Sequence, residues 1–362
     1  MFWRGMARAS TSSRCKFDRT GGLWRNHRAM KLPLIGLVAT SLFAYAHPEH
    51  ATQPGKDIPH AATVGNGAWT FETVPGWGKL PDGKNLGPTH GSVLSGADGK
   101  VYFSTDAAMS IIVYEADGKF VKTIAPECVG FHAMALRTEA GKEVIYGAQL
   151  KKGRVCKIDT DGKLLLEIPN ANTAAVQGGW NGLTAVTVAP DGSIFAATGY
   201  GAQMIHKFDA TGKLIKSFGG KGAGNGQFNT CHGLAIDTRF GAPRLLVADR
   251  GNRRLVHTDM EGAFIEVHAK GLRLPCMVDI MGDFCAVAEL ESRVTILGKD
   301  GVPVAFLGDN PDKKQWANFK VPVAAWKEGI FTAPHGLCFD QSGNIYVQDW
   351  NVSGRVTKLI KK

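Results

Sequence analysis

The chain has 362 residues, of which 44% are hydrophobic, and a formal net charge of +10. Most of that charge is N-terminal: residues 1–46 hold eight basic groups against Asp18, which leaves +3 for the other 316 residues. So small a residual charge predicts no nucleic-acid partner for the main body. The 45 glycines and 16 prolines, without long apolar helical stripes, favour an all-β chain of short strands and turns.

The N-terminal segment predicts an exported protein. Residues 1–29 are interpreted as a basic extension or a misassigned start, and residues 30–46 as a signal peptide. The signal peptide has a basic start at Lys31, an apolar stretch over residues 32–43 and a small-x-small cleavage site at Ala44-Tyr45-Ala46. The apolar stretch is too short to span a bilayer, so a signal peptide is favoured over an anchor and no stable membrane span is expected.

The mature chain would begin at His47, with a flexible segment over residues 47–68, in a secreted or periplasmic location. Disulfides are permitted in such a location. The mature chain retains six cysteines without a C-x-x-C pair, which supports neither a zinc knuckle nor a redox motif. The disulfide pairing therefore stays open.

A repeated unit of up to four short strands follows. Residues 69–74 form a lone strand, and six copies of the unit then begin at His90, His132, Thr184, His232, Met277 and His335. The last copy lacks its fourth strand. The lone strand would complete that copy and close the ring without an exposed edge. We therefore predict one domain, a six-bladed β-propeller over residues 69–361.

The copies resemble NHL repeats. The glycine-rich turn of these repeats is matched by residues 222–228, and their V-A-D-x-x-N-x-R pattern by residues 247–254. This resemblance implies a propeller architecture of the NHL type. It does not imply an activity, because one fold serves both enzymes and binding modules.

The residues that begin the first strand of each copy are expected to converge at the channel mouth. His132, His232 and His335 come from alternate copies, 100 and 103 residues apart, so their imidazoles would face one centre. Three neutral imidazoles with open positions are typical of a catalytic zinc site, although copper and iron also suit this ligand. The alternative is that each histidine only hydrogen-bonds the neighbouring blade and binds no metal.

The other residues at the mouth have less specific roles. His90 would be a bystander, a substrate contact or a fourth ligand, while Thr184 and Met277 would line the channel. A second polar ring, at the ends of the second strands, comprises Asp106, Gln149, Thr198, Asp249, Glu289 and Asp349. Most of these acidic residues would cap turns. Tyr200 and Arg250 follow two members of this ring and do not fit a turn role.

A closer resemblance, to the lyase module of peptidylglycine α-amidating enzymes, is carried by residues 198–208, 226–232, 247–250 and 333–335. That family is a six-bladed propeller with zinc on three histidines. The resemblance implies zinc on His132, His232 and His335, Tyr200 as base, and Arg250 as the group that binds a substrate carboxylate. The implied reaction cleaves a carbinolamide of a small or peptide-linked substrate to an amide and a glyoxylate-like product. A separate monooxygenase would supply that substrate.

Some positions depart from the family's pattern. Ala333 replaces a methionine, Gly336 stands where the family has an acidic calcium ligand, and the family's disulfide cysteines have no counterparts. Structural calcium is therefore not expected. Two alternatives stay open. One is a non-catalytic NHL propeller that binds a protein or polysaccharide through exposed Trp316, Phe319 and Trp326. The other is a lactonase-type hydrolase, whose calcium centre would be rich in carboxylates rather than imidazoles.

Overall fold

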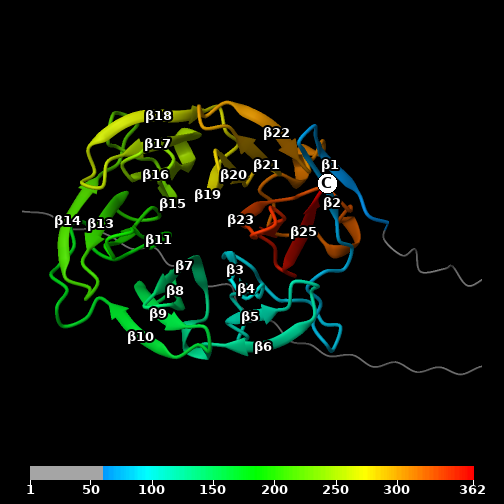
Figure 1. The fold of residues 1–362 in the computed structure, drawn as a ribbon, viewed down its shortest axis with the longest axis horizontal. Coiled ribbons are helices and arrows are strands. Elements are labelled where there is room, and N and C mark those ends of the chain that lie inside the picture. The colour runs from blue at the N-terminus through cyan, green and yellow to red at the C-terminus, as the bar shows by residue number, and fades with distance from the viewer. Residues whose placement is uncertain (1–59) are drawn as a thin grey trace, which may run out of the picture. The chain divides into compact units, whose positions relative to one another are not determined.

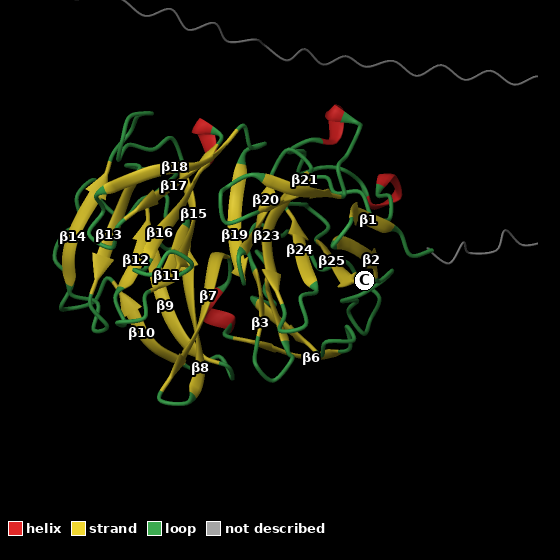
Figure 2. Ribbon diagram, turned by 45° about the horizontal axis from the view of Figure 1, so that its top comes forward, coloured by secondary structure: helices red, strands yellow, loops and turns green. Residues whose placement is uncertain are grey.

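The computed structural model describes residues 60–362, which form six antiparallel sheets around a central axis (Figure 1). The predicted all-β, six-bladed propeller is confirmed. Helix is confined to short turns in the loops (Figure 2), namely the 3-10 helices η1 (Pro126–Cys128), η2 (Arg250–Asn252), η3 (Lys313–Gln315) and η4 (Val323–Ala325). No helix in the described part is long and apolar enough to cross a bilayer. The N-terminal extension, the signal peptide and the cleavage site lie outside the described residues.

Each blade is a meander whose first strand is innermost (Figure 1). Blades one and two comprise β3 (Val93–Ser95), β4 (Val101–Ser104), β5 (Ile111–Tyr114), β6 (Phe120–Ile124), β7 (Phe131–Glu139), β8 (Lys142–Gln149), β9 (Arg154–Asp159) and β10 (Leu164–Ile168). Blades three and four comprise β11 (Ala185–Val188), β12 (Ile194–Ala197), β13 (Met204–Phe208), β14 (Leu214–Gly219), β15 (Cys231–Asp237), β16 (Arg244–Asp249), β17 (Arg254–Thr258) and β18 (Phe264–Lys270). Blade five comprises β19 (Pro275–Met281), β20 (Phe284–Glu289), β21 (Arg293–Leu297) and β22 (Pro303–Leu307).

Blade six joins the two ends of the described chain. It contains β23 (Pro334–Phe339), β24 (Ile345–Asp349), β25 (Arg355–Lys361), β2 (Trp69–Thr73) and β1 (Thr63–Asn66). As predicted, an N-terminal strand closes the ring, because β2 pairs with β25 through Phe71 and Lys361. The sheet also continues into β1, which differs from the flexible segment expected up to residue 68. The sequence pattern of β1 indicates a strand only weakly, because Val64 is its one buried side chain.

Burial decreases from the axis outward. The inner strands β11 and β23 are buried at every position, whereas the outer strand β14 is partly exposed. The side chains at the start of the inner strands are therefore held by packing on both faces, which favours a rigid site. All six cysteines in the described part are buried and free.

Candidate functional site

A β-bulge places a histidine at the channel mouth in blades two, four and six. In β7 the register shifts between Phe131 and Ala133, so that His132 lies between two paired residues. His232 in β15 and His335 in β23 occupy the same bulged position. A bulge re-aims a side chain, and here the three imidazoles converge. Their ring centroids lie 4.7, 4.7 and 4.8 Å apart, a nearly equilateral triangle.

The neighbouring blade orients each imidazole through a backbone carbonyl. The Nδ1 atoms lie 2.6, 3.1 and 3.0 Å from the carbonyl oxygens of Thr184, Cys276 and Gly91, for His132, His232 and His335 respectively. Because a carbonyl only accepts hydrogen bonds, each Nδ1 carries the proton and each Nε2 keeps its lone pair. The hydrogen bonds to the next blade therefore exist, but they leave the three Nε2 atoms available to a metal ion.

The donor set fits a borderline divalent metal. The three histidines are buried, and burial holds the pKa of each well below its usual value, so the imidazoles are neutral at physiological pH. The Nε2 atom of His335 is buried without a hydrogen-bond partner, an arrangement that costs about 1–3 kcal/mol unless a cation or water satisfies it. Two overlapping groups have ligand atoms within 4.8 Å of one another: His90 with His132 and His335, and His232 with Cys276 and His335.

Tyr200 and Arg250 complete this cluster. The Tyr200 hydroxyl lies 3.2 Å from His132 Nε2 and 3.0 Å from His232 Nε2, and it accepts a hydrogen bond of 3.1 Å from Arg250 Nη1. The ring is 37% exposed at the mouth, but desolvation of the hydroxyl raises the pKa of Tyr200 to about 12, against the opposing charge of Arg250. Without a metal, this phenol is therefore protonated at neutral pH, and the guanidinium beside it is suited to an anionic group.

In blade five, the strand pairing shows that the residue at the channel mouth is not the predicted one. The bulge in β19 falls between Pro275 and Met277, so the residue equivalent to His232 is Cys276. The prediction of Met277 at this position was wrong by one residue, because blade five has no histidine in this strand to fix the alignment of the repeats. Met277 instead lines an axial cavity of about 310 Å³ built from the six inner strands.

Blade one shows a displacement of one residue in the opposite direction. Ser104 donates its backbone N–H to the carbonyl of Ser92, which makes Gly91, and not His90, the residue equivalent to His132. His90 nevertheless reaches the cluster: its ring centroid lies 4.5 Å from that of His132 and 4.8 Å from that of His335. Its Nε2 lies 3.4 Å from the Tyr200 hydroxyl. The structure thus brings a fourth histidine to the site, from the residue just before the position equivalent to His132.

The remaining predicted mouth residues do not point their polar atoms to the centre. Thr184 occupies the expected position in blade three, but its hydroxyl donates to the carbonyl of Cys231 at 2.8 Å. Asp249 is buried, and its carboxylate accepts from the backbone of Asn229 and from the side chain of Arg254, as expected for a turn cap. In blade one, the turn position belongs to Thr105 rather than Asp106.

Sequence reasoning missed Cys276 and Trp350. Cys276 was missed because the repeats were aligned one residue too late in blade five. Trp350 follows Asp349 directly, as Arg250 follows Asp249, and this spacing was a usable signal. The Trp350 ring lies 5.7 Å from that of His90 and 4.9 Å from that of Phe319, so the long insertion before β23 supports the wall of the mouth.

Comparison with known proteins supports the fold. No protein-family model matches the chain. A streptogramin B lyase has a TM-score of 0.52 at 14% identity and covers 83% of this chain and 98% of its own. A protein provisionally named a gluconolactonase has a TM-score of 0.52 at 16% identity, with coverages of 84% and 94%. A protein of unknown function from Bacteroides thetaiotaomicron has a TM-score of 0.56 at 13% identity, with coverages of 83% and 76%. These identities show a shared propeller fold, and the fold alone.

Proposed function

We propose that this chain is an exported, metal-dependent lyase of the peptidylglycine amidating type, built on an NHL-type propeller. It would cleave the C–N bond of a carbinolamide such as an α-hydroxyglycine derivative. The observation that carries the proposal is the placement of the Tyr200 hydroxyl among the Nε2 atoms of His132 and His232, with Arg250 beside it. Zinc is the proposed metal, on His132, His232 and His335.

The residues around the metal would divide the work of binding and proton transfer. A bound zinc ion supplies Lewis acidity to the substrate hydroxyl. Arg250 binds the substrate carboxylate through a charge-assisted hydrogen bond and thereby positions the hydroxyl at the imidazole triangle. Tyr200 accepts the hydroxyl proton as a phenolate. Desolvation raises the pKa of its hydroxyl to about 12, and the positive charge of Arg250 acts in the opposite direction and favours the phenolate.

The atoms of this reaction balance without a redox partner. The hydroxyl proton passes to Tyr200, the C–N bond breaks, and the same proton returns to the departing nitrogen. The products are a primary amide and an aldehyde acid such as glyoxylate. A separate monooxygenase would make the carbinolamide.

A further support is that virginiamycin B lyase from Staphylococcus aureus, which shares the fold at 16% identity and a TM-score of 0.51, is catalytically inactive as a histidine-to-alanine variant.

The direct test is incubation of the zinc-loaded protein with an α-hydroxyglycine derivative, with glyoxylate and amide measured together. We expect equal amounts of the two products, and we expect the His132→Ala variant to lose both the activity and the central metal. A fully metallated protein that releases no glyoxylate would refute the substrate assignment.

The two rival functions have less support at this site. Trp316 and Trp326 are half-buried, and their indole N–H groups donate to the backbone carbonyls of Asn310 and Val321. Phe319 is half-buried as well. The insertion therefore uses these aromatics for its own packing rather than presenting them to a protein or polysaccharide. A lactonase-type calcium centre would need hard oxygen ligands. The two groups of possible metal ligands at the mouth have none, because one consists of three imidazoles and the other of two imidazoles and a thiol.

A further inference from the structure

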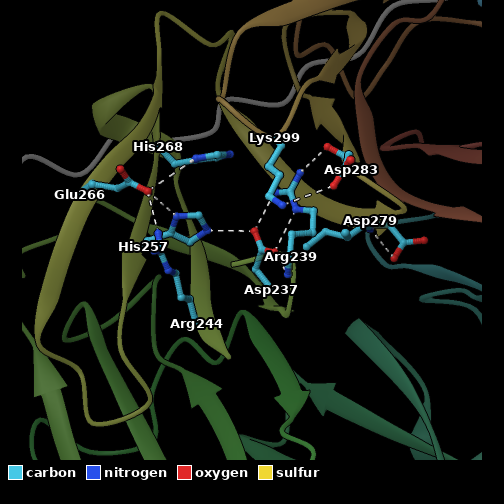
Figure 3. Close-up of polar contacts among 10 residues, drawn as sticks. Asp237, Arg239, Arg244, His257, Glu266, His268, Asp279, Asp283 and Lys299 are labelled. Carbon is cyan, nitrogen blue, oxygen red and sulfur yellow. Dashed lines mark hydrogen bonds and ion pairs between the residues drawn. The ribbon is translucent and has the colours of Figure 1, made fainter. Parts of the chain in front are cut away.

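A second cluster of metal-ligating side chains lies on the third and fourth strands of blade four. It comprises His257 on β17 and Glu266 and His268 on β18, whose ligand atoms lie within 4.8 Å of one another. Figure 3 shows His257 between Asp237 and Glu266, with His268 beside His257 and also facing the Glu266 carboxylate. These residues take no part in the proposed reaction, so their arrangement needs its own explanation.

His257 departs from a pattern that three other blades share. At the equivalent third-strand position, three blades place a lysine over the aromatic ring of its cross-strand partner. The pairs are Lys157 with Tyr146, Lys207 with Phe195, and Lys358 with Tyr346. In blade four the cross-strand partner is Leu246, and an imidazole replaces the ammonium group. The substitution exchanges a cation for a group that can bind one.

The proton of His257 is placed by a buried carboxylate. The Nε2 atom lies 3.0 Å from Asp237 Oδ2, and Arg239 binds both oxygens of the same carboxylate at 2.9 and 2.6 Å. Because a carboxylate held in this way only accepts, Nε2 carries a proton, and Nδ1 is the nitrogen that can bind a second proton or a metal ion. That Nδ1 atom faces Glu266 Oε1 at 3.1 Å. Two acceptors at this distance require a cation between them, either a proton or a metal ion.

His268 distinguishes a metal ion from a proton. Its position is a bulge in β18, where the register shifts opposite Leu255 and Val256, and the bulge turns its ring toward His257 at a centroid distance of 4.5 Å. The Nε2 atom of His268 is buried without a hydrogen-bond partner, and Nδ1 lies 4.0 Å from Glu266 Oε1. A proton on His257 would satisfy His257 and Glu266 alone. A metal ion would also use the second imidazole.

We propose that His257, Glu266 and His268 bind a second divalent metal ion of the zinc class, separate from the channel mouth. Two imidazoles and one carboxylate are a known zinc ligand set, and the Asp237 carboxylate behind His257 is the usual outer partner of a ligating histidine. Arg244 Nη1 also donates to Glu266 Oε1, at 3.0 Å, so this carboxylate shares its charge between the guanidinium and the metal. The ion links β17 to β18 within the blade that also carries His232 and Arg250.

Zinc stoichiometry of the full chain tests this proposal. We expect about two zinc ions per chain for the wild type after equilibrium dialysis, and one fewer for His268→Ala. His132→Ala should lose the other ion, which separates this inference from the proposed function. His206→Ala is the matched control. That histidine is also buried on a third strand, but it is bonded to Ser217 and Thr198 instead of a carboxylate. Its zinc content should match that of the wild type.

A second variant protects the test against misfolding. The Glu266 side chain is 45% exposed, so Glu266→Gln should leave the fold intact, and we expect its zinc affinity at this site to fall by about 10–100-fold. Loss of one zinc ion in both variants, with an unchanged control, supports the second site. Equal zinc content and affinity in wild type, His268→Ala and Glu266→Gln would overturn it and leave a protonated His257 as the cation in the cluster.

Discussion

The two histidine clusters are built in opposite ways. At the channel mouth, His132, His232 and His335 come from three blades, and each is oriented by a backbone carbonyl of the next blade. In blade four, His257 and His268 lie on adjacent strands, and the Asp237 carboxylate orients the first while a bulge in β18 orients the second. The first cluster therefore exists only once the ring has closed, whereas the second requires one sheet. Long-range and local assembly can thus be separated within the same molecule.

The largest expected effect concerns chemistry at the mouth. Under the proposed function, Tyr200→Phe should reduce kcat by about 10²–10⁴-fold, because it removes the proton acceptor and leaves the imidazoles in place. Metal content should not change. Tyr114→Phe is a matched control, since Tyr114 is buried and its hydroxyl has no partner in the described structure. Near-normal kcat in Tyr200→Phe would remove this residue from the mechanism.

The next effect concerns the ion pair behind the blade-four cluster. Burial alone would raise the pKa of Asp237, but hydrogen bonds from His257 and Arg239 outweigh it and hold the pKa well below its usual value. The stabilisation is therefore present above pH of about 4 and is lost as the pH falls toward the folded-state pKa. Asp237→Asn should cost about 3–5 kcal/mol at neutral pH, because the buried Arg239 loses its partner.

Denaturant unfolding at a series of pH values measures this contribution. The free energy of unfolding of Asp237→Asn should depend less on pH below about 4 than that of the wild type. Asp117→Asn, in an exposed turn, should reproduce the wild-type curve. Parallel curves for wild type and Asp237→Asn would show that this carboxyl has an ordinary pKa.

A smaller effect should follow from moving two blades apart at the mouth. A Cβ atom on Gly233 would lie 2.2 Å from the carbonyl oxygen of Cys276, which is the acceptor for His232 Nδ1. Gly233→Ala should therefore weaken zinc binding at the mouth by about 10–100-fold and leave the blade-four cluster unchanged. Ala133→Gly, at the equivalent position in blade two, is the reciprocal control and should have little effect on zinc affinity. Competition with a chelator measures both affinities.

The smallest effect is expected at the thiol. Burial raises the pKa of Cys276 to about 11 despite Arg250, and His232 uses the backbone carbonyl of this residue rather than its sulfur. Cys276→Ser should therefore change zinc affinity by less than about tenfold, since three imidazoles already supply a complete protein ligand set. A sulfur-to-cobalt charge-transfer band in the cobalt-substituted wild type, absent from Cys276→Ser, would instead make the thiol a ligand.

Much of the architecture could be read from the repeat. The period of strands and turns predicted six blades, and the missing last strand predicted closure by residues 69–74, which the pairing of β2 with β25 confirms. The alternate spacing of His132, His232 and His335 predicted that the three would meet, and their rings do converge. These inferences succeeded because alternation and turn chemistry are local properties of the chain.

Other features could not be read in this way. The displacement of the ring from His90 to Gly91 and from Met277 to Cys276 depends on strand register, which is fixed by the pairing of the strands. The approach of His268 to His257 depends on another bulge, in β18.

By itself, the sequence determined the number of blades, the closing strand and the three histidines from alternate blades that face the axis, because each follows from the recurrence of one repeat along the chain. Only the tertiary structure decided which nitrogen of each imidazole is free, which carbonyls orient the rings, and that Tyr200 and Arg250 meet between them. Those contacts join neighbouring blades, 50 and 52 residues apart in the chain. They exist only when the blades pack and each inner strand lies against the next.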